Sequence, residues 1–141
     1  AATYLTDLFS ASDANDFVIG SRYIPGGGIE NWEGWRYGLS YWGNAYARLL
    51  TGLPIKDLTA GFYCIRAPLL RRMDLDALKS SGYAFQIDIK FHASHDLGAS
   101  MIEVPIVFKQ RREGESKISR HIIREGLLTP LRILRRRLSL Q

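Results

Sequence analysis

The sequence predicts an α/β fold with a mixed sheet, flanking helices and an amphipathic helix at its C-terminal end. Short runs rich in β-branched residues alternate with longer stretches in which apolar residues recur at helical spacing. The chain has 141 residues, 46% of them hydrophobic, which is enough for one sizeable core. No linker-like segment divides it, so we expect residues 1–141 to form a single domain.

The first predicted strand ends at a candidate binding residue. A short helix is expected over residues 3–11, and the apolar run 17–20 predicts a buried strand. Arg22 follows that strand, ahead of a Gly-rich loop over residues 25–28. Ligands of open α/β sheets bind at the carboxyl ends of strands, so Arg22 is well placed to meet one.

A long helix is expected next, beginning at the capping residue Asn31 and running to about Leu50. Apolar and aromatic residues recur along one broad face of it, including Trp32, Trp35 and Trp42. Arg36 and Ser40 are four residues apart, so they project from the same side of this helix.

The rest of the chain continues the alternation of strands and helices. Pro105 lies inside the last predicted strand, which favours a sheet edge or a bulge there. In chain order we expect a strand over 61–66, one helix or two short ones over 67–78, a short strand or extended segment over 83–85 leading into a helix that ends near Gly98, a strand over 101–108, a polar loop over 110–117, and a basic amphipathic helix over 119–138 that is interrupted at Pro130.

Positive charge is concentrated at the C-terminal end. Residues 109–141 hold 10 Lys or Arg against 3 Asp or Glu, a balance of +7, whereas the whole chain carries +5. Such a segment suits an anionic partner, which could be a phosphorylated ligand, a membrane face or nucleic acid, although charge alone favours a solvated surface. The most apolar stretch, residues 126–134, is too short to cross a bilayer. Cys64 is the one cysteine, so no disulfide can form within the chain.

Several motifs occur in an order and spacing that cover nearly the whole chain. They are the segments 19–23 and 26–32, Ser40 with Gly43-Asn44, and the segments 57–62, 81–88, 103–106 and 114–117. Together they resemble the dolichyl- or polyprenyl-phosphate mannosyltransferases of glycosyltransferase family two.

This resemblance implies an incomplete GT-A-like, Rossmann-related glycosyltransferase domain. The chain resembles the acceptor-side portion, and the family's N-terminal nucleotide-binding half is absent from it. The implied activity is inverting transfer of mannose from GDP-mannose to the phosphate of a polyprenol or dolichol lipid, which supplies a lipid-linked sugar for glycosylation. A divalent metal, Mg or Mn, is expected in the full enzyme, with Asp-x-Asp ligands that are not in this chain. No metal ligand and no catalytic residue are assigned here.

The resemblance also assigns binding residues. The acceptor is a phosphate that is already ionised, so it needs cations and hydroxyl donors that hold and orient it. Arginine suits this because its planar fork bonds two phosphate oxygens. The expected phosphate-binding residues are Arg22, Arg36, Ser40, Arg111, Ser116 and Lys117. Gln86, Asp88 and Asp57 are expected on the donor and sugar side, although Asp57 is equally suited to a structural role in a turn.

A hydrophobic lipid acceptor implies that the protein works at a membrane surface. The helical tryptophans suit a bilayer interface, and the C-terminal helix combines leucines with arginines as interfacial helices do. We therefore expect a peripheral protein at the cytoplasmic face of a membrane, with a membrane-anchoring subunit or domain as an open alternative. No nucleic-acid partner is expected.

Three rival interpretations remain at the level of sequence. A related enzyme would transfer glucose or an aminosugar to the same lipid phosphate. A nucleic-acid-binding module would use the basic tail, but this does not explain the placement of Arg22 and Arg36. A non-catalytic fragment would bind lipid or an anionic partner.

Overall fold

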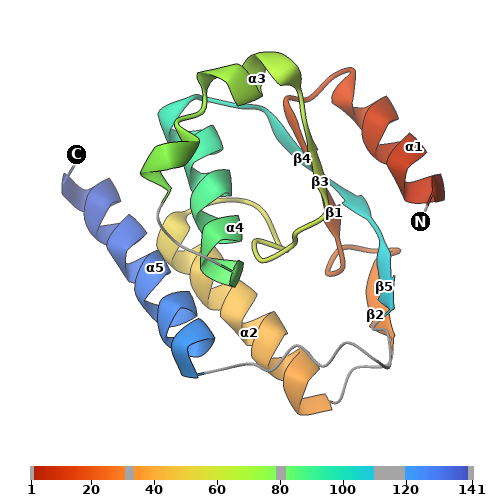
Figure 1. Ribbon diagram of the computed structural model, residues 1–141. Helices are drawn as coiled ribbons and strands as arrows, with labels where there is room; N and C mark the ends of the chain where they lie inside the picture. Colours follow the sequence, from red (N-terminus) through yellow and green to blue (C-terminus); the bar gives the residue numbers. More distant parts are fainter. Residues whose placement is uncertain (1, 31–33, 79–81, 110–119, 140–141) are drawn as a thin grey trace.

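The computed structural model describes residues 2–30, 34–78, 82–109 and 120–139. Its helices and strands alternate along the chain (Figure 1). The elements are α1 (Ala2–Ser12), β1 (Phe17–Ser21), β2 (Gly28–Glu30), α2 (Gly34–Thr51), β3 (Tyr63–Ile65), α3 (Ala67–Arg72), the 3₁₀ helix η1 (Leu75–Ala77), α4 (Gly82–Phe91), the π-helical turn η2 (His92–Asp96), β4 (Met101–Pro105), β5 (Val107–Lys109) and α5 (Arg120–Ser139).

The central sheet is mixed, as the sequence predicts. Its three strands lie in the order β3-β1-β4, with β1 antiparallel to β3 and parallel to β4. All five residues of β1 are buried. Helix α1 packs along the strands on one side, and α2, α4 and α5 form a group on the other (Figure 1).

A second, two-stranded sheet continues directly from the first. Ile106 joins the two, since its N–H donates to the Ser21 carbonyl at 2.9 Å and its own carbonyl accepts from the Gly28 N–H at 3.0 Å. Residues 22–27 therefore leave the sheet and return to it opposite a single residue. Strands β2 and β5 then pair in parallel. This arrangement explains Pro105, which lies where the predicted strand over 101–108 passes from one sheet to the other.

Glycine is required at the end of the 22–27 loop. The loop closes with a hydrogen bond from the Gly27 N–H to the Ile24 carbonyl at 2.9 Å. A Cβ atom on Gly27 would lie 2.5 Å from the Ser21 carbonyl oxygen, which is backbone and cannot move aside cheaply. The close return of the chain to Ser21 thus depends on the missing side chain.

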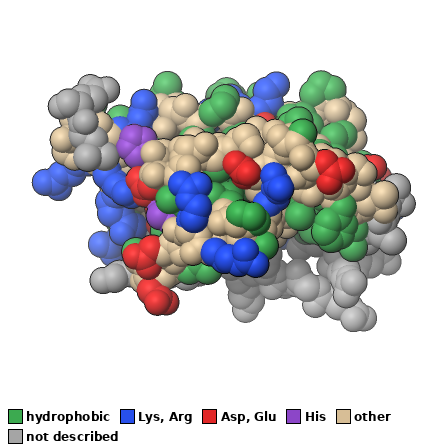
Figure 2. Space-filling view, turned by 90° about the horizontal axis from the view of Figure 1, so that it is seen from above, with side chains coloured by type: hydrophobic (Ala, Val, Ile, Leu, Met, Phe, Trp, Pro, Cys, Tyr) green, Lys and Arg blue, Asp and Glu red, His purple; other side chains and the backbone are tan. Residues whose placement is uncertain are grey.

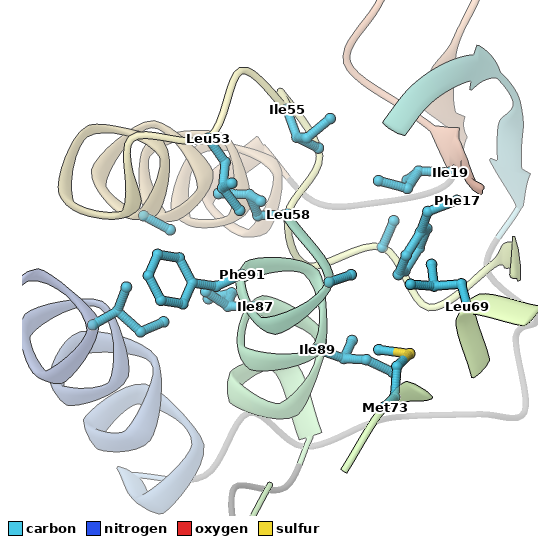
Figure 3. Packing of buried hydrophobic residues seen from close by; sticks show 14 residues of the cluster. Phe17, Ile19, Leu53, Ile55, Leu58, Leu69, Met73, Ile87, Ile89 and Phe91 are labelled. Carbon is cyan, nitrogen blue, oxygen red and sulfur yellow. The ribbon is translucent and has the colours of Figure 1, made fainter. Parts of the chain in front are cut away.

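One hydrophobic core joins the sheet to the helices, and α4 lies in the middle of it (Figure 3). Ile87 and Phe91 point toward Leu53, Leu58 and α5, whereas Ile89 lies on the side of Met73. The helix therefore contributes to two halves of the core at once. Because α4 is central, a polar side chain on it can contact loops that surround the core.

Two expectations for secondary structure are wrong. Residues 83–85 begin α4 and are not extended, because Ala84 and Ile87 are buried against the core in a helical register. The C-terminal helix is not interrupted, since α5 runs through Pro130. Among the other expectations, the two short helices after residue 67 and the strands near 17–20 and 61–66 are confirmed. The expected cap Asn31 and the polar loop over 110–117 lie outside the described residues.

Helix α5 packs against α2 and α4 along its length, and one contact from α2 lies beside its proline. Pro130 has no N–H to donate to the carbonyl one turn earlier, so the hydrogen-bond ladder of the helix is weakened there. The Tyr46 hydroxyl donates to the neighbouring Leu127 carbonyl at 2.9 Å. The carbonyl that lacks the proline's N–H is that of Gly126, so the bond from Tyr46 ties α5 to α2 one residue away from the weak point and does not replace the missing donor.

Candidate functional site

A buried ion pair stands at the carboxyl end of β1. Arg22 donates from Nε to Asp57 Oδ2 and from Nη2 to Asp57 Oδ1, both at 2.8 Å, and its backbone N–H donates to Asp57 Oδ2 at 2.9 Å. Arg22 is 8% exposed and Asp57 is fully buried. Burial alone would lower the pKa of Arg22, but the hydrogen bonds and negative charge of Asp57 raise it above its usual value. The guanidinium is thus a fixed cation at the strand end.

Three side chains from different elements fix residues 57–61, here called the 57–61 loop. The Glu103 carboxylate of β4 accepts from the backbone N–H groups of Lys56 and Asp57 at 2.9 and 3.2 Å. Asn44 of α2 accepts from the Thr59 N–H at 3.0 Å through Oδ1. Lys90 of α4 donates to the carbonyls of Leu58 and Ala60. A loop with so many specific bonds is preorganised rather than adaptable.

Lys90 is the least expected member of this arrangement. Its side chain is completely buried, and Nζ donates to the carbonyls of Leu58 at 3.0 Å, Ala60 at 2.8 Å and Gln86 at 3.2 Å. The same ammonium lies 5.0 Å from the centre of the Tyr63 ring. Burial lowers the pKa of Lys90 to about 7, with Asp57 opposing that shift. All three protons of the ammonium form are used, which fits a lysine that serves the loop and not solvent.

A cavity of about 350 Å³ lies between α2, α4 and α5, beside the 57–61 loop. Most of its wall is apolar or aromatic, and Arg36 is the cation among the described residues that line it. The lining residues are Arg36, Leu39, Ser40, Trp42, Gly43, Tyr46, Thr59, Tyr83, Ile87, Ile123, Gly126 and Leu127.

The polar groups of the cavity connect to the buried ion pair. The Asn44 amide donates to the Ser40 carbonyl at 2.9 Å and to the Thr59 hydroxyl at 3.0 Å. Arg22 Nη2 donates to the same hydroxyl at 3.1 Å. On the other side, the Tyr23 hydroxyl lies 2.5 Å from Ser40 Oγ and donates to it. Thr59 lines the cavity, and its hydroxyl accepts from Arg22. The Arg22–Asp57 pair therefore lies directly behind Thr59, on the side away from the cavity.

The structure brings together part of the predicted phosphate-binding set. Arg36 and Ser40 line the cavity, one helical turn apart. Arg22 is not among the residues that line the cavity. It donates to Thr59, which does line it, and it is bonded to Asp57. Direct contact between Arg22 and a phosphate stays a prediction. Arg111, Ser116 and Lys117 lie outside the described residues, and their predicted role is neither supported nor opposed.

None of the three predicted donor-side residues is among the residues that line the cavity: Gln86 and Asp88 are on α4, and Asp57 is in the 57–61 loop. Gln86 packs against Gly61, where a Cβ atom on the glycine would be 3.6 Å from the Gln86 amide nitrogen. Gln86 Oε1 is buried and has no hydrogen-bond partner among the described residues. Asp88 is half-buried on the same helix. Asp57 serves Arg22. The donor-binding roles of these three residues stay predictions.

No group of three or more His, Cys, Asp or Glu in the described ranges could hold a metal ion. The family resemblance implies a divalent metal whose Asp-x-Asp ligands are not in this chain, and no described residue is assigned to it. The nearest acidic and histidine group is structural. Asp96 in η2 accepts from Arg136 of α5 at 2.8 Å and lies 2.7 Å from His92 Nδ1. Although partial burial opposes it, these partners lower the pKa of Asp96.

Apolar and basic side chains are exposed on the two helices that form the cavity. On α2, Trp35 and Trp42 are 63% and 70% exposed, so neither belongs to the core. On α5, Leu127, Leu131 and Leu138 are exposed beside arginines. Figure 2 shows basic side chains gathered at the end of the molecule where α5 ends, with mixed charges elsewhere on that face. Within the described ranges, no helix has the length and apolar character needed to span a bilayer.

Sequence reasoning missed Thr59, Asn44, Glu103 and Lys90 as members of the site. The first three lie within motifs noticed in the sequence, but nothing local said which side chains they would contact. One feature of the sequence could have pointed to Lys90. It is four residues after Gln86, so both project from the same side of α4, which faces the 57–61 loop.

Comparison with known proteins identifies several relatives of this chain. No protein-family profile matches it. It is 44% identical over 128 residues to the undecaprenyl-phosphate mannosyltransferase of Micrococcus luteus, and 46% identical over 124 residues to the polyprenol monophosphomannose synthase of Mycolicibacterium smegmatis. It is 31% identical over 119 residues to the dolichol-phosphate mannosyltransferase of Saccharomyces cerevisiae.

These alignments cover most of this chain but less of the relatives. The two bacterial matches cover 91% and 87% of the chain, and 52% and 46% of the respective relatives, so the chain spans about half their length. The chain is thus homologous to mannosyltransferases. More narrowly, it is homologous to the polyprenol- and dolichol-phosphate mannosyltransferases, and the resemblance seen in its motifs is confirmed.

Proposed function

We propose that the full-length gene product carrying this chain transfers mannose from GDP-mannose to the phosphate of a polyprenol lipid, and that this chain supplies the acceptor side of a GT-A-like domain. The proposal is supported by homology to mannosyltransferases at 44% and 46% identity. The single observation that carries the acceptor assignment is the cavity in which Arg36, Ser40 and Thr59 meet an apolar wall.

The reaction needs few groups from this half of the enzyme. An oxygen of the lipid phosphate attacks the anomeric carbon of mannose, the bond from that carbon to the diphosphate breaks, and GDP leaves with the electron pair. Attack from the opposite face inverts the anomeric centre. Because a phosphate is ionised at neutral pH, it needs orientation and charge balance rather than a general base.

The residues lining the cavity suit such an acceptor. Arg36 offers a guanidinium, which bonds phosphate oxygens in pairs and keeps its charge. Ser40 and Thr59 offer hydroxyls, and the fixed cation Arg22 lies directly behind Thr59. Leu39, Trp42, Ile123 and Leu127 present the apolar surface that the first isoprene units next to the phosphate require.

The membrane side of the proposal rests on the exposed residues of α2 and α5. Trp35 and Trp42 suit the headgroup region, and the leucines of α5 suit the upper acyl region. Each exposed arginine of α5 adds roughly 1 kcal/mol of attraction to an anionic leaflet. We propose a peripheral association in which the cavity opens toward the lipid surface, at the cytoplasmic face where nucleotide sugars are available.

A transfer assay tests this function. The full-length gene product is mixed with GDP-mannose and undecaprenyl phosphate in detergent, and lipid-linked mannose is measured. We expect product, and we expect Arg36→Ala to raise the KM for the lipid phosphate at least tenfold while leaving the KM for GDP-mannose nearly unchanged. Absence of product with an excess of both substrates would contradict the proposal.

The identity of the donor sugar has an alternative, because a related enzyme would transfer glucose or an aminosugar to the same lipid phosphate. UDP-glucose and UDP-N-acetylglucosamine, offered in the same assay, test whether a related lipid-phosphate transferase is present. Mannose transfer at a clearly higher kcat/KM supports the mannosyltransferase. A higher value for either of the other donors would replace mannose while keeping the lipid-phosphate acceptor.

A further inference from the structure

We propose that the Thr59 hydroxyl donates a hydrogen bond to the phosphate of the acceptor, and that Arg22 and Asn44 aim its proton by occupying both lone pairs of its oxygen. This inference rests on the proposed function and adds to it a specific binding residue that the motifs did not assign.

The argument begins with the donors around Thr59 Oγ1. Arg22 Nη2 lies 3.1 Å from this oxygen, and a guanidinium can only donate. Asn44 Nδ2 lies 3.0 Å from it. The orientation of the Asn44 amide is fixed independently, because its Oδ1 accepts from the Thr59 N–H while its Nδ2 donates to the Ser40 carbonyl. Both neighbours of the hydroxyl are therefore donors.

A hydroxyl has two lone pairs and one proton. With both lone pairs engaged, Thr59 can take no further donor, and its one remaining capacity is to donate. No acceptor for this proton is recorded among the described residues. Thr59 is half-buried and lines the cavity with Arg36 and Ser40, so an oxygen bound in the cavity is the acceptor within reach.

The surroundings hold this hydroxyl in place before any ligand arrives. Lys90 bonds the carbonyls on either side of Thr59 in the chain, those of Leu58 and Ala60. Glu103 bonds the N–H of Asp57. A donor that does not need to be reoriented binds an anionic oxygen with little loss of entropy. The positive charge of Arg22 further polarises the hydroxyl toward donation.

The chemistry selects an acceptor-rich ligand over a donor-rich one. A phosphate oxygen fits, whereas the free hydroxyl of a polyprenol would offer a weaker acceptor and no charge. The same chemistry could come from the diphosphate of the nucleotide sugar. The placement of Thr59 beside an apolar wall favours the lipid phosphate, and the experiment separates the two.

The test uses Thr59→Val in the full-length gene product, which keeps the shape and removes the hydroxyl. Binding of farnesyl phosphate and of farnesol is measured in detergent by titration calorimetry, together with the KM for undecaprenyl phosphate and for GDP-mannose. We expect affinity for farnesyl phosphate to fall roughly 10- to 100-fold, as for loss of a hydrogen bond to a charged group. Affinity for farnesol and the KM for GDP-mannose should change less than threefold.

Three further variants keep the test sharp. Thr59→Ser retains the hydroxyl and should restore binding to within about threefold of the wild type. Thr59→Cys retains the size with a weaker donor and should bind with intermediate affinity, which keeps the test informative if the valine variant does not fold. Thr129→Val is the matched control, since Thr129 is a buried threonine that also accepts from an arginine, Arg132 at 2.8 Å, but it does not line the cavity.

The outcomes separate this inference from the function beneath it. If wild-type protein makes lipid-linked mannose but the valine variant binds farnesyl phosphate normally, the Thr59 inference is overturned and the proposed function stands. An equal loss for farnesol, or a loss confined to GDP-mannose, also overturns it. If the wild type binds farnesyl phosphate no better than farnesol, both proposals fail together.

Discussion

Cationic side chains are used in two different ways in this molecule. Around the 57–61 loop, Arg22 and Lys90 are buried, and the positions of their charged groups are defined by Asp57 and by backbone carbonyls. On α5, Arg132 and Arg135 are exposed to solvent. A buried cation demands its partners, because an unpaired charge in the interior is strongly unfavourable. An exposed cation is solvated with or without a partner, so it is available for a surface such as a membrane.

Substitutions of cationic residues in these two regions should therefore affect different properties of the protein. Changes around the 57–61 loop should act on folding and on the geometry of the cavity. Changes of an exposed arginine on α5, such as Arg135, should leave folding nearly unchanged and act on association with lipid. The predictions below test this contrast, from the largest expected effect on stability to the smallest.

Asp57→Ala should have the largest effect, because it leaves the Arg22 guanidinium buried without its carboxylate. We expect a loss of about 3–5 kcal/mol in the free energy of unfolding. Urea denaturation of the full-length gene product, followed by tryptophan fluorescence, measures it. The double variant Asp57→Ala with Arg22→Met should recover part of the loss, and failure to recover any would argue against the ion pair as the cause.

Lys90→Met should remove a pH dependence of stability. In the folded protein the pKa of Lys90 is lowered to about 7, whereas the unfolded chain keeps the ordinary value of 10.5. Between these values the unfolded state holds more protons, so wild-type stability should rise with pH across this window. Relative to the variant, the rise should be about 2–3 kcal/mol between roughly pH 7.5 and 9.5. Parallel curves for the two proteins would contradict a buried, shifted lysine.

Gly27→Ala should destabilise through backbone overlap, since the new Cβ would lie 2.5 Å from the Ser21 carbonyl oxygen. We expect a loss of about 1–3 kcal/mol, the range for forced overpacking. Gly28→Ala is a suitable control, because no atom lies within 4 Å of a Cβ built there. Equal thermal midpoints for the two variants would contradict the close return of the loop.

Arg135→Gln on α5 should have the smallest effect on stability, within about 0.5 kcal/mol. Its effect should appear instead on vesicles. Binding to phosphatidylglycerol vesicles should weaken by about 1 kcal/mol, and binding to neutral phosphatidylcholine vesicles should not change. Co-sedimentation measures both. An equal change on the two lipids would mean that charge attraction is not the function of this residue.

The fold could be predicted well where its signals are local. The strand over 17–20 and the helix from Asn31 to about Leu50 follow from periodicity, and the structure has β1 at Phe17–Ser21 and α2 at Gly34–Thr51. Residues 83–85 were misjudged because Tyr and Phe favour strands, whereas the helix there is decided by what Ala84 and Ile87 bury. Pro130 was judged a helix breaker for a sound local reason. The helix continues because α5 packs against α2 and α4, which are remote in sequence.

The site could be predicted only in part for the same reason. Strand-end position singled out Arg22, and the four-residue spacing predicted that Arg36 and Ser40 lie on one side of α2. Arg36 and Ser40 do line one cavity, whereas the binding roles of all three residues stay predictions. The partner that defines Arg22 is Asp57, 35 positions away along the chain. Likewise, a lysine among isoleucines gives little sign that three carbonyls will surround it. These facts belong to tertiary structure and have no short-range counterpart in the sequence.

The way in which Ile106 bonds to both Ser21 and Gly28 has an evolutionary consequence. Strand register on either side of the 22–27 loop is set by that one residue opposite, so it does not depend on how many residues the loop contains. Insertions or deletions between Arg22 and Gly27 can therefore change the length of this loop without shifting either sheet. Homologous chains can therefore differ in this loop while inheriting an unchanged scaffold.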